Sequence, residues 1–263
     1  MSSAVPEQEI TRLEPRGPKG LKVRVHLDPP DPPAEDGAAP DDASPALLTV
    51  ALEAVERLKL GVGDLLGPEL RRKLLAADAD VRVRDAALNL LSYRARTRTE
   101  LFRKLRKKDF GTARVDRCLD RLEERGLLDD AEVAAAHVRD RLRLKPRGRA
   151  KLRSELRAKG VAAATADAVV DEVLDQADTD DRTLAARVAE RWVERQSDDL
   201  LRALVERDDR EAHQKARRRL YGYLGRRGFR GGAVSRGMDV ARDEARRRLQ
   251  GPVDGPPAHG DTT

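Results

Sequence analysis

Apolar residues recur at three- and four-residue spacing over most of the chain, and this period predicts amphipathic helices. From Val81 onward these helices come in groups of three. In the first group, a helix around Ala87 to Leu91 is followed by a second around Leu101 to Leu105 and a third that ends at Gly126. Glycine just after the last apolar position is a common helix end. The pattern therefore predicts short helices joined by tight turns.

The groups of three resemble one another. A shift of 51 residues places Leu101 on Leu152, and a further shift of 68 places Leu152 on Leu220 and Gly160 on Gly228. Apolar positions that match at two independent shifts indicate tandem repeats, in which each repeat buries part of its face against a neighbour. The fold class that we expect is all-α, with three tandem three-helix repeats in an elongated curved array.

The first part of the chain has a different pattern. Leu21, Val23 and Val25 alternate with polar residues, which is the period of a strand, and a cluster of glycine and proline precedes them. This predicts a small N-terminal β-hairpin-like extension, with a first strand at Ile10 to Leu13. A linker rich in proline follows, for which no structure is expected.

Two helices are expected between this linker and the first repeat. One runs from Leu47 to a point before Gly61, and a shorter one opens at Pro68, a residue that fits the first position of a helix. The predicted parts are a hairpin-like segment at 1–27, a flexible linker at 28–45, a helical module at 46–80, repeats at 81–127, 128–178 and 179–250, and a disordered tail at 251–263. The third repeat contains an insertion near 198–210, itself a short helix.

Charge is concentrated in part of the chain. Lys and Arg outnumber Asp and Glu by 22 to 11 between residues 94 and 160 and by 12 to 3 between 214 and 248, whereas 161–213 carries 15 acidic and 7 basic side chains. Aromatic residues are only 3% of the chain, so base stacking is poorly supplied. Contacts of Arg and Lys with phosphate, or with an acidic protein surface, fit the composition better.

Several kinds of chemistry find no support in the sequence. Cys118 is the single cysteine and lies on the apolar side of its helix, so we expect a buried thiol. The four histidines show no spacing typical of metal ligands, and no nucleophile triad or P-loop pattern occurs. Asp129 and Asp130 precede a helix, where capping is the expected role. We therefore expect no enzyme and no cofactor. With no secretory leader or long apolar run, we expect a cytoplasmic protein.

Five segments resemble motifs of the RecX family, the bacterial regulators of RecA recombinase. They are Ala87 to Arg94, Thr99 to Leu105, Leu128 to Asp130, Gly148 to Val161 and Leu224 to Phe229. The resemblance covers about residues 81–249. It implies three three-helix repeats in a curved molecule that lies in the groove of the RecA filament on DNA. It also implies lower RecA ATPase, strand exchange and SOS activity, and a role in DNA repair and recombination.

Three basic clusters are the candidate contacts with single- or double-stranded DNA or with RecA. Helical spacing places three lysines of the first cluster on one face, where like charges with few acidic neighbours favour a functional role over a solvated surface. Some residues of the second cluster must be plain surface, because one helix cannot present all of them in one direction. The candidates are Arg94, Arg96, Arg98, Lys104, Lys107, Lys108, Arg141, Arg143, Lys145, Arg147, Arg149, Lys151, Arg226, Arg227 and Arg230.

Two other functions stay open at this point. A stand-alone helical DNA-binding protein, such as a nucleoid or transcription factor, would bind duplex tightly with a steep dependence on salt. A purely structural helical-repeat adaptor would have no affinity for DNA. We expect a monomer with no membrane partner, and we expect Phe229 after Gly228 to close the core of its repeat.

Overall fold

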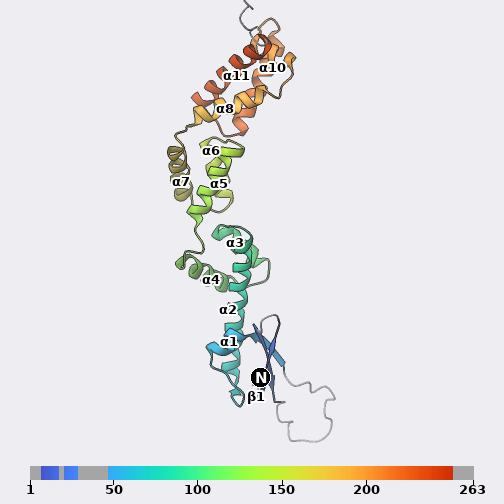
Figure 1. Ribbon diagram of the computed structural model, residues 1–263, viewed down its shortest axis with the longest axis vertical. Coiled ribbons are helices and arrows are strands. Elements are labelled where there is room, and N and C mark those ends of the chain that lie inside the picture. The colour runs from blue at the N-terminus through green and yellow to red at the C-terminus, as the bar shows by residue number, and fades with distance from the viewer. Residues whose placement is uncertain (1–6, 18–20, 29–46, 251–263) are drawn as a thin grey trace, which may run out of the picture. The chain divides into compact units, whose positions relative to one another are not determined.

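The computed structural model describes residues 7–17, 21–28 and 47–250, and most of them are helical (Figure 1). The chain divides into two compact units, Met1–Arg96 with Leu101–Leu128, and Thr97–Glu100 with Asp129–Thr263. Helices in groups of three follow a small N-terminal sheet, which confirms the predicted fold class. The predicted linker at 28–45 and the tail at 251–263 lie almost wholly outside the described residues.

The first unit begins with a four-stranded antiparallel sheet of order β3-β2-β1-β4. Ile10 lies opposite Leu27 and Val23 opposite Val50, and all four side chains are buried on the face that packs against the helices. The expected pair of strands is therefore present but extended by two further strands. Their bounds are β1 (Gln8–Arg16), β2 (Lys22–Leu27), β3 (Leu47–Ala51) and β4 (Leu65–Leu66).

The prediction of a helix from Leu47 is wrong for its first five residues, which form β3, and only α1 (Leu52–Arg57) is helical. The apolar spacing fits a helix, but pairing with β2 buries Val50 in the sheet core and satisfies the backbone. The strand also gains a side-chain tie, because Asp78 Oδ1 accepts a hydrogen bond of 2.8 Å from the backbone N–H of Ala51.

The helix expected at Pro68 and the first helix of the first repeat are one continuous helix, α2 (Pro68–Tyr93). No glycine or proline interrupts residues 69–93. Leu74 and Ala77 belong to the core under the sheet, whereas Val83 and Ala87 belong to a second core with α3 (Arg98–Arg106) and α4 (Thr112–Glu124). The two predicted modules therefore share a helix, and each keeps its own core.

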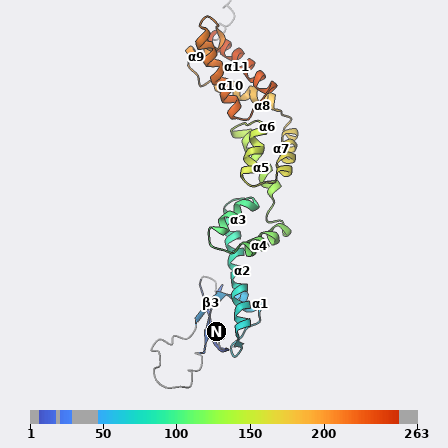
Figure 2. The same cartoon turned by 180° about the vertical axis from the view of Figure 1, so that it is seen from behind.

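The second unit holds the second and third repeats around one core. Phe229 is 1% exposed and follows Gly228, whose φ is +89°, so it closes the core as expected. The insertion in the third repeat contains the expected short helix, and Figure 2 shows it packed with the last two helices. The helices are α5 (Asp130–Leu144), α6 (Arg149–Ala158), α7 (Ala163–Gln176), α8 (Asp181–Val193), α9 (Asp198–Val205), α10 (Arg210–Arg226) and α11 (Gly232–Gln250).

The same tie between a helix start and an aspartate occurs twice in this unit. Asp130 Oδ1 accepts from the backbone N–H of Arg98 at 2.7 Å, and Asp181 Oδ1 accepts from that of Arg149 at 2.9 Å. The aspartate one residue earlier is the N-cap of its helix in both cases, as expected for Asp129. An Asp-Asp pair therefore caps its own helix and also the helix of the preceding repeat.

Candidate functional site

The basic residues of the first cluster fall into two groups. Lys104, Lys107 and Lys108 are exposed on α3 and the turn that follows it, and no ion pair is found for them among the described residues. Arg96, by contrast, is 9% exposed, and its Nε donates a hydrogen bond of 3.0 Å to the carbonyl of Leu90. Its guanidinium therefore supports the turn after α2, while the three lysines remain candidate contacts.

The other two arginines of this cluster have partners within the chain. Arg94 is exposed and donates from Nη1 to the carbonyl of Ala95 at 2.9 Å. Arg98 begins α3, and Asp130 holds its backbone N–H, as described above. Burial raises the pKa of Asp130, although hydrogen bonding to Arg98 and the charge of Arg98 act in the opposite direction.

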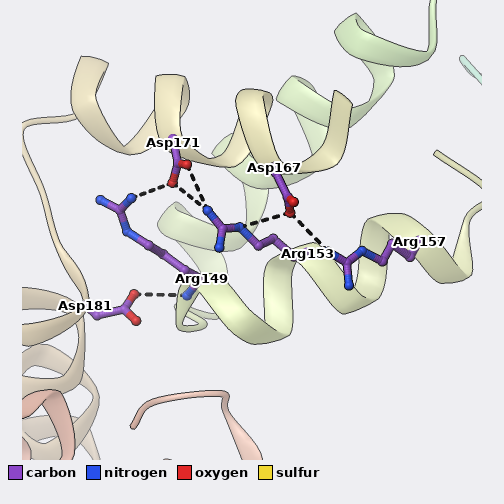
Figure 3. Close-up of polar contacts among 6 residues, drawn as sticks. All are labelled: Arg149, Arg153, Arg157, Asp167, Asp171 and Asp181. Atoms are coloured by element: carbon purple, nitrogen blue, oxygen red, sulfur yellow. Dashed lines mark hydrogen bonds and ion pairs between the residues drawn. The ribbon is translucent and has the colours of Figure 1, made fainter. Parts of the chain in front are cut away.

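The second cluster is largely engaged in contacts between helices. Arg149, Arg153 and Arg157 recur every four residues on α6 and alternate with Asp167 and Asp171 of α7 (Figure 3). Arg153 lies in the middle of this row of ion pairs, with Nη2 at 2.8 Å from Asp171 and Nε at 3.2 Å from Asp167. We call this row of ion pairs between Arg149, Arg153, Arg157, Asp167 and Asp171 the α6–α7 ladder. Because Asp171 pairs with Arg149, the charge of Arg149 is largely balanced inside the chain, which makes Arg149 a poor contact for an outside partner.

Glu155 engages two more members of the second cluster. Its carboxylate accepts from Arg141 Nε at 2.9 Å and lies 3.0 Å from His137 Nε2 and 3.8 Å from Arg147 Nε. Burial alone would raise the pKa of Glu155, but the hydrogen bonds from Arg141 and His137 lower it overall. Of the remaining candidates, Arg143 is exposed 3.6 Å from Asp140, Lys145 is exposed, and Lys151 is half-buried.

The structure brings candidates of the third cluster together with residues of α8. Arg219 and Arg226 of α10 and Arg227, which follows it, line a cavity of about 280 Å³ with Arg195, which follows α8. We call these four residues the α8–α10 arginine cluster. Among the described residues that line this cavity, none is acidic. Arg230 is exposed just beyond α10 and does not line it.

Two aromatic rings form part of the same cavity. The guanidinium carbon of Arg227 lies 3.6 Å from the ring centroid of Tyr223, a cation–π contact. The ring of Trp192 lies 6.3 Å from that of Tyr223, at an interplanar angle of 51°. The ring of Tyr223 therefore positions the Arg227 guanidinium at this cavity, and no carboxylate is among the described residues that line it.

Arg147 is held near this cluster by the backbone. The N–H of Gly148 donates to the carbonyl of Arg227 at 2.9 Å, which fixes the turn before α6 against the end of α10. Burial lowers the pKa of Arg227, although the nearby Tyr223 acts in the opposite direction, and the charges of Arg147, Arg195 and Arg226 lower it further. Like charges held this close favour an anion between them.

Such an arrangement can bind phosphate or carboxylate oxygens, because guanidinium groups offer paired N–H donors that match both anions. It cannot perform acid–base chemistry near neutral pH, since arginine stays protonated. Sequence reasoning missed Arg195, because it lies in a stretch with excess acidic residues and is brought to α10 only by folding. The shifts of 51 and 68 residues that relate the repeats do not single out Arg195 either.

Comparison with protein families matches residues 84–122 to the first three-helix domain of RecX and residues 129–170 to the second. A regulatory protein RecX of Mycolicibacterium vanbaalenii is 37% identical over 148 residues, which are 56% of this chain and 76% of the relative. The chain belongs to the RecX family. A RecX of Chlorobium phaeobacteroides is 38% identical over 78 residues, 30% of this chain.

The extent of these matches differs between relatives. This chain spans 52% of the length of the RecX of Chlorobium phaeobacteroides and 43% of that of Finegoldia magna. A crystal structure of regulatory protein RecX covers 88% of this chain and 99% of its own, at 23% identity and a TM-score of 0.63, which supports the fold. Among the described helices of this RecX chain, none has the length and apolar content needed to cross a membrane.

Proposed function

We propose that this RecX chain binds the RecA filament on DNA and lowers RecA ATPase and strand exchange, and with them recombination and SOS activity. Two observations support the proposal: membership of a family of regulatory proteins, and the α8–α10 arginine cluster. A cavity lined by four arginines and no acidic residue among the described residues needs an anionic partner, and a nucleoprotein filament presents phosphates and acidic side chains.

The cluster is the observation that carries the proposal, because no carboxylate among the described residues that line its cavity balances the charge of its arginines, whereas other candidate arginines are paired inside the chain. Arg96, Arg149 and Arg141 each have partners inside the chain, whereas the cluster residues share one cavity without a carboxylate. Lys104 and its two neighbouring lysines supply a second contact in the other unit. A filament repeats the same negatively charged groups along its length, so one filament can bind both the α8–α10 arginine cluster and these lysines.

The experiment is the rate of ATP hydrolysis by RecA on single-stranded DNA as the full chain is titrated in. We expect the rate to fall at substoichiometric amounts of the chain. A rate that stays constant at low salt, where electrostatic contacts are strongest, would overturn the proposal. Unchanged RecA activity together with tight, salt-dependent binding to free duplex would instead favour the stand-alone DNA-binding function.

A further inference from the structure

A second arginine-rich cavity lies in the first unit, between α1, α2 and α4. Its volume is about 310 Å³. Six arginines line it, together with two acidic residues, Cys118 and two apolar side chains, and none of these arginines belongs to a cluster that the sequence indicated. The arginines are Arg57, Arg84, Arg114, Arg117, Arg121 and Arg125. We call this the α4 arginine pocket.

The helix period explains how α4 supplies most of these charges. Arg114, Arg117, Arg121 and Arg125 are spaced three, four and four residues apart, which places them in one stripe along the helix. The buried positions of α4, such as Leu119, lie beside this stripe and face the core. One side of the helix therefore holds the unit together, and the adjacent side presents guanidinium groups to the cavity.

Only two of the six arginines have a carboxylate partner among the described residues of the pocket. Arg84 donates to Glu53 at 2.6 Å, and Arg114 donates to Asp80 at 2.7 Å. These pairs use both acidic residues of the lining. Four arginines remain to face the cavity without compensation, so the pocket has a net charge of about +4 before any ligand is bound.

The pKa directions of two lining residues bear on the charge of the pocket. A hydrogen bond from Arg84 lowers the pKa of Glu53, against the opposing effect of burial, and the charges of Arg84, Arg57 and Arg125 lower it further. Burial raises the pKa of the Cys118 thiol. The thiol therefore stays neutral near pH 7 and adds no negative charge to the cavity floor.

The shape favours a small ligand over a nucleic-acid strand. The charges line a concave space of a size that suits small molecules, because the α4 stripe is joined there by Arg57 of α1 and Arg84 of α2, whereas the lysines of α3 do not line this space. No aromatic side chain lines the cavity. Recognition therefore depends on a compact cluster of negative charge and not on a base.

We propose that the α4 arginine pocket binds the phosphate chain of a small polyphosphate, either inorganic or as part of a nucleoside triphosphate. Bidentate guanidinium groups on several sides can each take two phosphate oxygens. Four uncompensated charges match the charge of a triphosphate near neutral pH. This ligand is separate from the filament contact proposed above.

The test is calorimetric titration of the full chain with sodium triphosphate and with ATP in 100 mM salt without magnesium. We expect the two ligands to bind with affinities within about threefold of each other, because the pocket offers no platform for the base. The variant R121Q/R125Q should weaken both by roughly tenfold or more, since each lost hydrogen bond joins two charged groups. The variant R121K/R125K, which keeps the charge, should bind better than R121Q/R125Q.

The matched control is K104Q/K107Q, which removes two charges from exposed positions of the same unit outside the pocket. We expect less than a twofold change. An equal loss in both glutamine variants would overturn the proposal, because it would indicate attraction by the overall charge. Absence of triphosphate binding by the wild type would overturn it too. So would tighter binding of a single-stranded oligonucleotide that R121Q/R125Q weakens, which would make the pocket a nucleic-acid groove. None of these results depends on RecA.

Discussion

Gly228 fixes the contact between the second and third repeats, and replacing it by alanine tests that contact. Its φ of +89° lies in the left-handed region, and a Cβ there would meet the Cβ of Lys151 and lie 2.7 Å from its backbone nitrogen. Lys151 belongs to α6 of the preceding repeat, and its backbone cannot move without moving that helix. The added methyl group therefore forces the repeats apart.

Gly231 provides the matched control three residues later. Its φ is +51°, but a Cβ there would have nothing within 4 Å. Gly231→Ala should cost only the left-handed backbone conformation, about 1–2 kcal/mol. Gly228→Ala adds overpacking of about 1–3 kcal/mol, for a total of about 2–5 kcal/mol.

The assay is unfolding in urea followed by tryptophan fluorescence. Trp192 is the single tryptophan of the chain, it is 3% exposed, and it lies in the same unit as both glycines. We expect a clearly lower midpoint for Gly228→Ala than for Gly231→Ala. Equal midpoints would refute the close contact between α6 and the end of α10.

Three further perturbations have expected outcomes. Asp167→Asn with Asp171→Asn removes the α6–α7 ladder and should cost about 1 kcal/mol in low salt and less in 1 M NaCl, measured by urea unfolding, because the pairs are partly exposed. Glu155 has a lowered pKa in the folded chain, so its stabilisation is present above the unfolded pKa and is lost as pH falls through the folded pKa. Midpoints of wild type and Glu155→Gln should therefore differ at pH 7, and the difference should be lost only after the pH has fallen below the ordinary glutamate pKa of about 4.3. Cys118, buried with a raised pKa, should react with a thiol reagent roughly tenfold or more faster in urea than in buffer at pH 7.

Each of these expectations has a contradicting result. A loss of stability in Asp167→Asn with Asp171→Asn that salt leaves unchanged would indicate a packing defect instead of an ion-pair ladder. Loss of the difference between wild type and Glu155→Gln already above the ordinary glutamate pKa of about 4.3 would contradict the assigned pKa direction. Equal reaction rates of Cys118 in buffer and urea would contradict its burial.

The helices after Val81 could be predicted because local signals agree with the tertiary structure there. Apolar spacing and helix-end glycines such as Gly160 coincide with the observed elements. The strand β3 could not be predicted, because its apolar spacing also fits a helix and the deciding partner, β2, is about twenty residues away. The continuity of α2 was missed because an apolar period does not show where one core ends and the next begins.

The candidate site was predictable only as a region of excess positive charge. The sequence indicates many arginines, but it cannot show that Arg96 supports a turn or that Arg149 pairs with Asp171, since these partners meet through folding. For the same reason it gave no signal for Arg195 beside Arg227. The spacing of the α4 arginines up to Arg125 is visible in the sequence, but the prediction named the lysines of the neighbouring helix α3 instead.

The most direct test of the account compares two charge-reversal variants in the RecA ATPase assay on single-stranded DNA. R195E/R226E changes two exposed members of the α8–α10 arginine cluster, and R207E/R210E makes the same change at exposed residues of the same unit outside the cavity. We expect R195E/R226E to need at least about tenfold more protein for half-inhibition, since hydrogen bonds between charged groups are lost, while R207E/R210E stays close to wild type. Equal inhibition by R195E/R226E and wild type would contradict the claim that this cluster contacts the filament.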